Sequence, residues 1–258
     1  MKKLTSSELK DFLDLKVEHF EKPDFISDDP IQVPHRFSKK EDIEISAFLT
    51  ALIAWGQRKT IIRNAESLME RMDHQPHAFL MGMSKGEEEG FHDFVHRTFN
   101  GIDCCFFIQR LSKLYKKEGG LEGTLAILVA EQGTAAGLSA FKDLFFQGSP
   151  PARSKKHLAD PLAGSSAKRL NMFLRWMVRD ASKGVDFGLW KGVSPSQLSM
   201  PLDVHTGNVG RSLSILKHKQ NNWKAVAELD ASLRRMDPLD PVKYDFALYG
   251  LGVHEGWK

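Results

Sequence analysis

Residues 162–178 read Leu162-Ala-Gly-Ser-Ser-Ala-Lys-Arg-Leu-Asn-Met-Phe-Leu-Arg-Trp-Met-Val178. Leu170, Phe173 and Met177 recur with the spacing of one face of a helix. A glycine and two serines stand ahead of them, and these residue types are typical of a turn followed by a helix N-cap. The stretch therefore predicts an amphipathic helix, from about residue 166 to residue 178, with Lys168 in its first turn.

The same periodicity extends outward along the chain. Apolar residues recur at helical spacing in residues 45–53, 61–68 and 106–114, and no segment alternates in the manner of a strand. Two Ser/Thr-x-x-Glu capping boxes, Thr5 to Glu8 and Ser38 to Glu41, mark expected helix starts. Residues 23–34 lie between two prolines and predict an extended connector. We expect an all-α protein of about ten to twelve helices.

Composition narrows the class of protein. With 258 residues, 41% of them hydrophobic and 27% charged, the chain fits one large domain or two lobes and not a disordered protein. No apolar run approaches a membrane span, and the first residues lack the apolar core of a signal peptide, so we expect a cytoplasmic protein without a membrane partner. The adjacent Cys104 and Cys105 cannot supply a four-cysteine cluster, and we predict no metal or cofactor. The net charge of +3 permits nucleic-acid binding without requiring it.

A second motif, Pro201-Leu-Asp203-Val-His205, precedes another expected helix. Asp203 is well suited to cap that helix, since its side chain can accept a hydrogen bond from a free backbone amide. An aspartate can also orient and deprotonate a lysine amine, which is a nucleophile when neutral. Lys168 and Asp203 are therefore the expected catalytic pair, although a surface lysine and a plain N-cap would use the same residue types.

These segments resemble the helix-hairpin-helix (HhH-GPD) superfamily of DNA glycosylases. Its lyase members carry a Leu-Pro-Gly-x-Gly-x-Lys hairpin and then a Val-Asp-x-His motif, which Leu162, Gly164 and Lys168, followed by Asp203 and His205, match in order. The segment Phe48-Leu-Thr-Ala-Leu-Ile-Ala-Trp-Gly-Gln-Arg-Lys59 resembles the superfamily's early helix, which ends in a glutamine that probes the DNA beside a flipped base.

The chain also departs from that pattern. Ala163 replaces the hairpin proline and Ser166 the second glycine, and no iron–sulfur cluster motif is present. Lys168 and Asp203 are 35 residues apart, which is more like the archaeal 8-oxoguanine glycosylase branch than the endonuclease III branch. Residues 201–208 and 237–252 resemble, more closely still, an uncharacterised bacterial family.

The superfamily resemblance implies a two-lobed helical fold with a cleft between the lobes. One lobe would comprise residues 42–180 and the other residues 1–41 plus 181–258. The implied activity is removal of a damaged base, such as an oxidised purine, from double-stranded DNA without a cofactor, through a Schiff base on Lys168 assisted by Asp203. The sequence leaves the oligomeric state open, and a monomer is the default expectation. The implied DNA contacts are Gln57, Arg58, Lys59, Gly164, Ser165, Ser166, Arg169, His205 and Arg211, and the implied base-pocket residues are Trp55 and Trp190.

Two other interpretations remain open. In the first, the same fold binds DNA or RNA without catalysis, so that Lys168 contacts a phosphate and Asp203 only caps a helix. In the second, the protein is an unrelated helical interaction protein, and its basic residues are ordinary solvated surface. Borohydride trapping of an imine would separate the first from a lyase, and salt-dependent DNA binding would separate the second from both.

Overall fold

A computed structural model describes residues 4–257, and it is predominantly helical. Within those residues the only strands are β1 (Val95–His96) and β2 (Phe99–Asn100), which form a two-residue antiparallel pair. The expected all-α class is therefore confirmed. By contacts the chain divides into two compact units, unit 1 (Met1–Phe25 and Asp160–Lys258) and unit 2 (Ile26–Ala159).

This division differs from the expected lobes. Helix α7 (Lys168–Val178) belongs to unit 1 together with Asp203, whereas we expected it in the other lobe. The reason is its contacts with later residues. The Asn171 side chain donates to the carbonyl of Met200, and the backbone amide of Phe187 donates to the carbonyl of Trp176.

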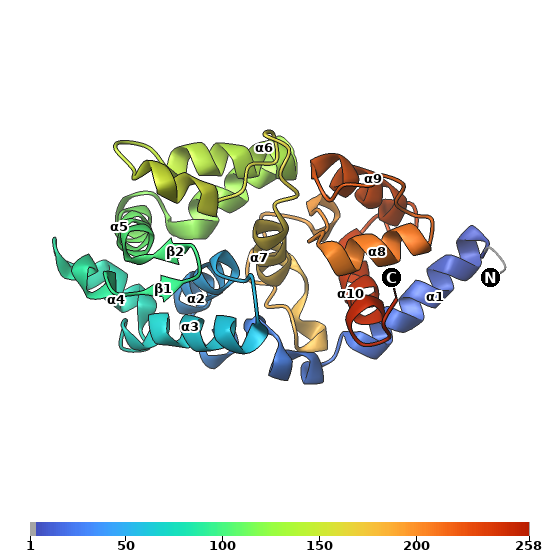
Figure 1. The fold of residues 1–258 in the computed structure, drawn as a ribbon, viewed down its shortest axis with the longest axis horizontal. Helices are drawn as coiled ribbons and strands as arrows, with labels where there is room; N and C mark the ends of the chain where they lie inside the picture. Colours follow the sequence, from blue (N-terminus) through green and yellow to red (C-terminus); the bar gives the residue numbers. More distant parts are fainter. Residues whose placement is uncertain (1–3, 258) are drawn as a thin grey trace. The chain divides into compact units, whose positions relative to one another are not determined.

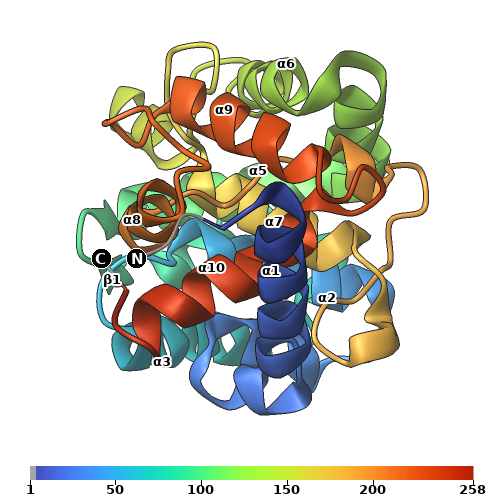
Figure 2. The same cartoon turned by 90° about the vertical axis from the view of Figure 1, so that its right-hand side faces the viewer.

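The described part of unit 1, residues 4–25 and 160–257, contains five α-helices with short 3-10 turns between them. These are α1 (Ser6–Phe20), α7 (Lys168–Val178), α8 (Val204–Ser212), α9 (Trp223–Arg234) and α10 (Tyr244–Val253). The turns are η1 (Pro23–Asp28, shared with unit 2), η7 (Ala181–Lys183), η8 (Pro195–Gln197) and η9 (Pro241–Lys243). Helix α10 packs against both α1 and α8 (Figures 1 and 2).

The contact between α10 and α1 is close because α10 carries glycines. A Cβ built on Gly250 would lie 2.2 Å from the Phe20 ring, and one built on Gly252 would lie 3.0 Å from the Cβ of His205 on α8. Helix α7 is buried on every side from Leu170 to Val178, including Arg175, so it is a core helix and not a surface amphipathic one.

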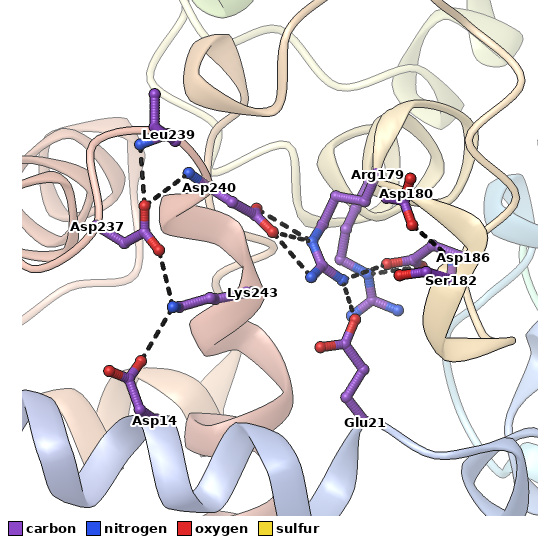
Figure 3. A network of polar contacts seen from close by, with 11 residues as sticks. Asp14, Glu21, Arg179, Asp180, Ser182, Asp186, Asp237, Leu239, Asp240 and Lys243 are labelled. Atoms are coloured by element: carbon purple, nitrogen blue, oxygen red, sulfur yellow. Dashed lines mark hydrogen bonds and ion pairs between the residues drawn. The ribbon is translucent and has the colours of Figure 1, made fainter.

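A buried ion-pair network joins three separate segments of unit 1 (Figure 3). Arg179, which follows α7, donates from Nη1 to Glu21 and to Asp186, each at 2.6 Å, and from Nε to Asp240 at 3.0 Å. Burial opposes the charge on this guanidinium, but the surrounding carboxylates outweigh it and raise the pKa of Arg179. The network fixes the end of α1, the loop after α7 and the turn before η9 in position relative to one another.

Unit 2 also consists of five α-helices. These are α2 (Lys40–Leu52), α3 (Arg58–Glu70), α4 (Pro76–Gly82), α5 (Gly101–Lys117) and α6 (Ile127–Phe145). Short turns connect them: η2 (Pro30–Gln32), η3 (Pro34–Arg36), η4 (Glu87–Phe91), a π-helical turn η5 (Glu122–Ala126) and η6 (Ala152–His157). Its core is a phenylalanine cluster in which Phe107 contacts Phe145 at 4.9 Å and Phe48 contacts Phe141 at 6.2 Å between ring centroids.

The helical stretch Glu122–Phe145 is long and apolar enough to cross a membrane by length and composition alone, and half of its apolar 18-residue window is buried within the protein. The core helix of a soluble protein meets the same criteria. This stretch is also not straight, because the backbone at Gly133 is non-helical, with φ 78° and ψ 166°. A Cβ on Gly137 would lie 2.7 Å from the backbone of Val129, so the two halves pack closely against each other.

Two local predictions were wrong and one is confirmed. Thr5 and Glu8 form the expected capping box of α1. Ser38 does not cap α2, whose N-cap is Lys39 without a side-chain hydrogen bond. The expected extended connector at residues 23–34 is instead wound into 3-10 turns, because its prolines occupy first-turn positions, where no amide donor is needed.

Candidate functional site around Lys168 and Asp203

Lys168 and Asp203, 35 residues apart in the sequence, lie together in unit 1. Lys168 Nζ is 3.6 Å from Asp203 Oδ2, a distance that makes an ion pair but not a tight hydrogen bond. Their side chains are 30% and 22% exposed, so both are half-buried and reachable from solvent. The pair thus presents an amine beside a carboxylate at an accessible position.

Asp203 has a structural task as well. Its Oδ1 accepts a hydrogen bond from the Thr206 amide at 3.0 Å, which makes it the N-cap of α8. The Asp203 carbonyl accepts from the Asn221 side chain at 2.8 Å. One carboxyl oxygen therefore caps the helix while the other faces Lys168, and the two roles coexist.

The segment that leads to Asp203 is held from α9. Asp230 accepts a hydrogen bond from the Met200 amide at 3.0 Å, and Arg234 donates to the Leu198 carbonyl at 2.6 Å. Desolvation raises the pKa of Asp230, which is buried, to about 6. Neither residue was singled out in the sequence, because a charged pair at i, i+4 on a helix is an ordinary surface pattern.

Arg175 and Asp245 add buried charge close to the pair. Arg175 donates to Asp245 at 2.5 Å and its Nε lies 3.3 Å from Asp186, while its guanidinium covers the Phe246 ring at 4.3 Å. Burial raises the pKa of Asp245 to about 6 and outweighs the ion pair with Arg175. Asp203 adds to that rise and Lys168 opposes it, so Asp245 is within electrostatic reach of both residues.

The turn before α7 differs from the expected N-cap. Helix α7 begins at Lys168, and its cap residue is Ala167 in the left-handed region, with φ 48°, not Ser166. The Ser165 hydroxyl accepts from the Ala167 amide. The amides of Gly164 and Ser165 donate within the turn, to the carbonyls of Pro161 and Asp160. The amides of Gly164 and Ser165 are therefore engaged within the turn and not directed at a ligand.

Other expected DNA contacts of unit 1 vary in accessibility. His205 is exposed in the first turn of α8. Arg169 is half-buried, and burial lowers the pKa of its guanidinium to about 10, which leaves it charged at neutral pH. Arg211 donates to the His218 carbonyl and to Asn221, so it supports the residue that holds Asp203. Trp190 is fully buried with its ring against Phe173 at 5.3 Å, which makes it a core residue that a flipped base does not reach in this conformation.

The expected contacts of unit 2 lie at the turn between α2 and α3. Gln57 is the exposed N-cap of α3, Lys59 is exposed, and Arg58 is half-buried. Trp55, also half-buried, contacts the rings of His96 and His157. No cluster of three or more residues suited to hold a metal ion occurs among the residues that the structure describes.

A family of proteins of unknown function, DUF2400, matches residues 29–254. The chain belongs to the DUF2400 family. The match spans helices α2 to α10 and so includes Lys168, Asp203 and the turn at Gln57. No curated protein and no solved structure matches this DUF2400 chain.

Proposed function

We propose that this DUF2400 protein is a DNA repair glycosylase with AP lyase activity, which removes a damaged base from double-stranded DNA through a Schiff base on Lys168. The observation that carries the proposal is the 3.6 Å separation between Lys168 Nζ and Asp203 Oδ2 at an accessible position. It is supported by the order of the motifs along the chain, which resembles that of the superfamily's lyase members.

The chemistry needs a neutral amine beside a carboxylate. Asp203 accepts a proton from the Lys168 ammonium, and the amine then attacks C1′ of the sugar as the bond to the base breaks. The departing base takes up the proton that Asp203 received, directly or through water. Ring opening gives an imine between Lys168 and C1′. Loss of the proton at C2′ then expels the 3′ phosphate by β-elimination. Once it has passed on the proton from Lys168, Asp203 is again a carboxylate and stabilises the positive charge of the protonated imine.

The target nucleotide has to leave the duplex to meet the amine. Unstacking costs a few kcal/mol and is easiest for damaged or mispaired bases. The accessible Lys168 and Asp203 side chains provide a surface for the displaced nucleotide, and the charged Arg169, which follows Lys168 in α7, is a candidate contact for its phosphate.

The test is borohydride trapping on duplexes that contain 8-oxoguanine, an oxidised pyrimidine, uracil or an abasic site. The wild type should form a covalent adduct. Lys168→Arg, which keeps the cation but cannot form this imine, should form none. Asp203→Asn preserves the N-cap, because asparagine caps as well as aspartate, and should lower the rate about 10²- to 10⁴-fold.

A matched lysine control is Lys224→Ala, because Lys224 lies in the first turn of α9, as Lys168 lies in the first turn of α7, and its side chain is exposed. Its adduct yield should equal that of the wild type. DNA binding without an adduct on any of these duplexes, the abasic one included, would refute the lyase and leave the non-catalytic alternative.

A further inference from the structure

Three segments of unit 2 carry positive charge without any acidic residue. They are the turn at residues 55–60, the β1–β2 hairpin at residues 95–100 and η6 at residues 152–157. Together they contain six lysines and arginines and no aspartate or glutamate. The cations are Arg58, Lys59, Arg97, Arg153, Lys155 and Lys156. Because the net charge of the whole chain is only +3, this is a local concentration of charge.

Trp55 brings the three segments together. Its ring meets His96 of the hairpin edge-on at 4.9 Å and lies nearly parallel to His157 of η6 at 6.1 Å. The carbonyl of Trp55 also lies 3.1 Å from Nε2 of His96. Arg153 donates to the Thr98 carbonyl at 3.0 Å, which joins η6 directly to the hairpin turn. We call these three segments, which the contacts above hold next to one another, the Trp55 face; its exposed side chains include Gln57, Lys59, Arg97 and Arg153.

A buried carboxylate anchors this surface from below. Asp103, in the first turn of α5, is fully buried and accepts hydrogen bonds from the Ser154 hydroxyl at 2.7 Å and the Asn100 amide at 3.1 Å. It also pairs with Arg153 at 3.1 Å and with His157 at 3.2 Å. The position of η6 against the hairpin is therefore fixed by the buried side chains of Asp103, Ser154 and His157, together with the exposed Arg153.

Arg97 occupies an unusual position on the Trp55 face. It stands in the two-residue turn of the hairpin with φ 55°, a left-handed conformation that glycine or asparagine normally adopts. Its side chain lies over Gly56, where a Cβ would be 2.9 Å from Nη1 and 3.3 Å from Cδ. Arg97 is exposed, and no residue of the described range 4–257 accepts a hydrogen bond from its guanidinium or pairs with it.

We propose that the Trp55 face binds the phosphate backbone of double-stranded DNA, with Arg97 and Lys59 as phosphate contacts. Arg97 stands at a turn position that favours glycine, and its side chain lies over Gly56, which leaves room for it. Because its guanidinium has no internal partner among the described residues, it is available to an external anion. The absence of acids from all three segments fits a polyanion. This inference rests on the proposed function, because it supplies the DNA contacts of a unit that lacks Lys168.

The test is the salt dependence of binding to a duplex with a tetrahydrofuran abasic analogue, which cannot form an imine. Each phosphate contact contributes about 0.9 to the slope of log K against log salt concentration. Arg97→Gly should lower that slope by about 0.9, and it should leave the turn intact because glycine accepts φ 55°. Arg97→Lys should keep most of the slope. Lys117→Ala also removes one positive charge, but at the far end of α5, about 25 Å along the helix from its first residue. It should leave the slope unchanged.

An unchanged slope in Arg97→Gly, or an equal loss in Lys117→Ala, would overturn the inference, as would a wild type whose DNA binding does not depend on salt. If Arg97→Gly lowered the slope for a single-stranded probe of the same length but not for the duplex, the duplex would be excluded as the partner. Adduct formation at saturating protein on a natural abasic site is measured in parallel. If the wild type forms no adduct but Arg97→Gly still lowers the slope, only the lyase activity is rejected. If the wild type forms the adduct and Arg97→Gly leaves the slope unchanged, only DNA binding by the Trp55 face is rejected.

Discussion

Replacing Asp230 by asparagine should make the stability of unit 1 less sensitive to pH. Asp230 is 4% exposed, and desolvation raises its pKa from 3.8 to about 6, although the Met200 amide and Arg234 oppose the rise. The folded state therefore holds this proton more tightly than the unfolded state does. This tighter proton binding stabilises the folded wild type fully below pH 3.8. The contribution, about 3 kcal/mol, is lost as pH rises from 3.8 through about 6. Asparagine can still accept from Met200 but does not ionise.

The assay is equilibrium urea unfolding of both proteins at several pH values. The unfolding free energy of Asp230→Asn minus that of the wild type should increase by about 2 kcal/mol between about pH 4.5 and about pH 7.5, most of the full shift. Asp237→Asn is the control, because Lys243 and neighbouring amides lower the pKa of Asp237 despite some burial. Its difference from wild type should stay flat over that range. A flat difference for Asp230→Asn as well would refute the reasoning.

Two further substitutions test the packing and the charge network of unit 1. Lys243→Met removes the amine that pairs with Asp14 at 3.0 Å and with Asp237 at 2.8 Å. In urea unfolding at neutral pH it should lower the unfolding free energy by about 2 kcal/mol. The loss should shrink as pH falls below 3.8, because both carboxylates have lowered pKa values and their contribution to stability disappears once they are protonated. Gly250→Ala forces a methyl group into the Phe20 ring and should destabilise by about 1–3 kcal/mol, whereas Gly82→Ala, with nothing within 4 Å, should not; equal effects would show that α10 and α1 are not closely packed.

Short-range patterns in the sequence predicted much of what the structure contains. The spacing of Leu170, Phe173 and Met177 predicted α7, and an aspartate ahead of an apolar repeat predicted the N-cap of α8. These features depend on residues within one or two helical turns, so a single sequence carries them. The pairing of Lys168 with Asp203 was predicted from their chemistry and from the resemblance, and not from helical spacing.

Features that depend on long-range contacts could not be read from the sequence. Arg175 and Asp245 look like surface charges until the fold buries both of them within one unit. Trp190 looks like a stacking residue in an irregular loop, yet it fills the core beside Phe173. Arg97 gives no sequence signal at all, because a left-handed turn residue is recognised from sequence mainly when it is glycine or asparagine.

The discontinuity of unit 1 has a consequence for synthesis on the ribosome. Unit 2 is one continuous segment, whereas α1 has to wait for α10, which begins at Tyr244, before their contact can form. At translation rates of about 5–20 residues per second, the roughly 220 intervening residues take about 10–45 s. During that time the apolar face of α1, with Leu9, Leu13 and Val17, lacks its native cover. The nascent chain therefore presents this apolar face of α1 to chaperones and proteases until α10 has been made, and unit 2 can complete its core first.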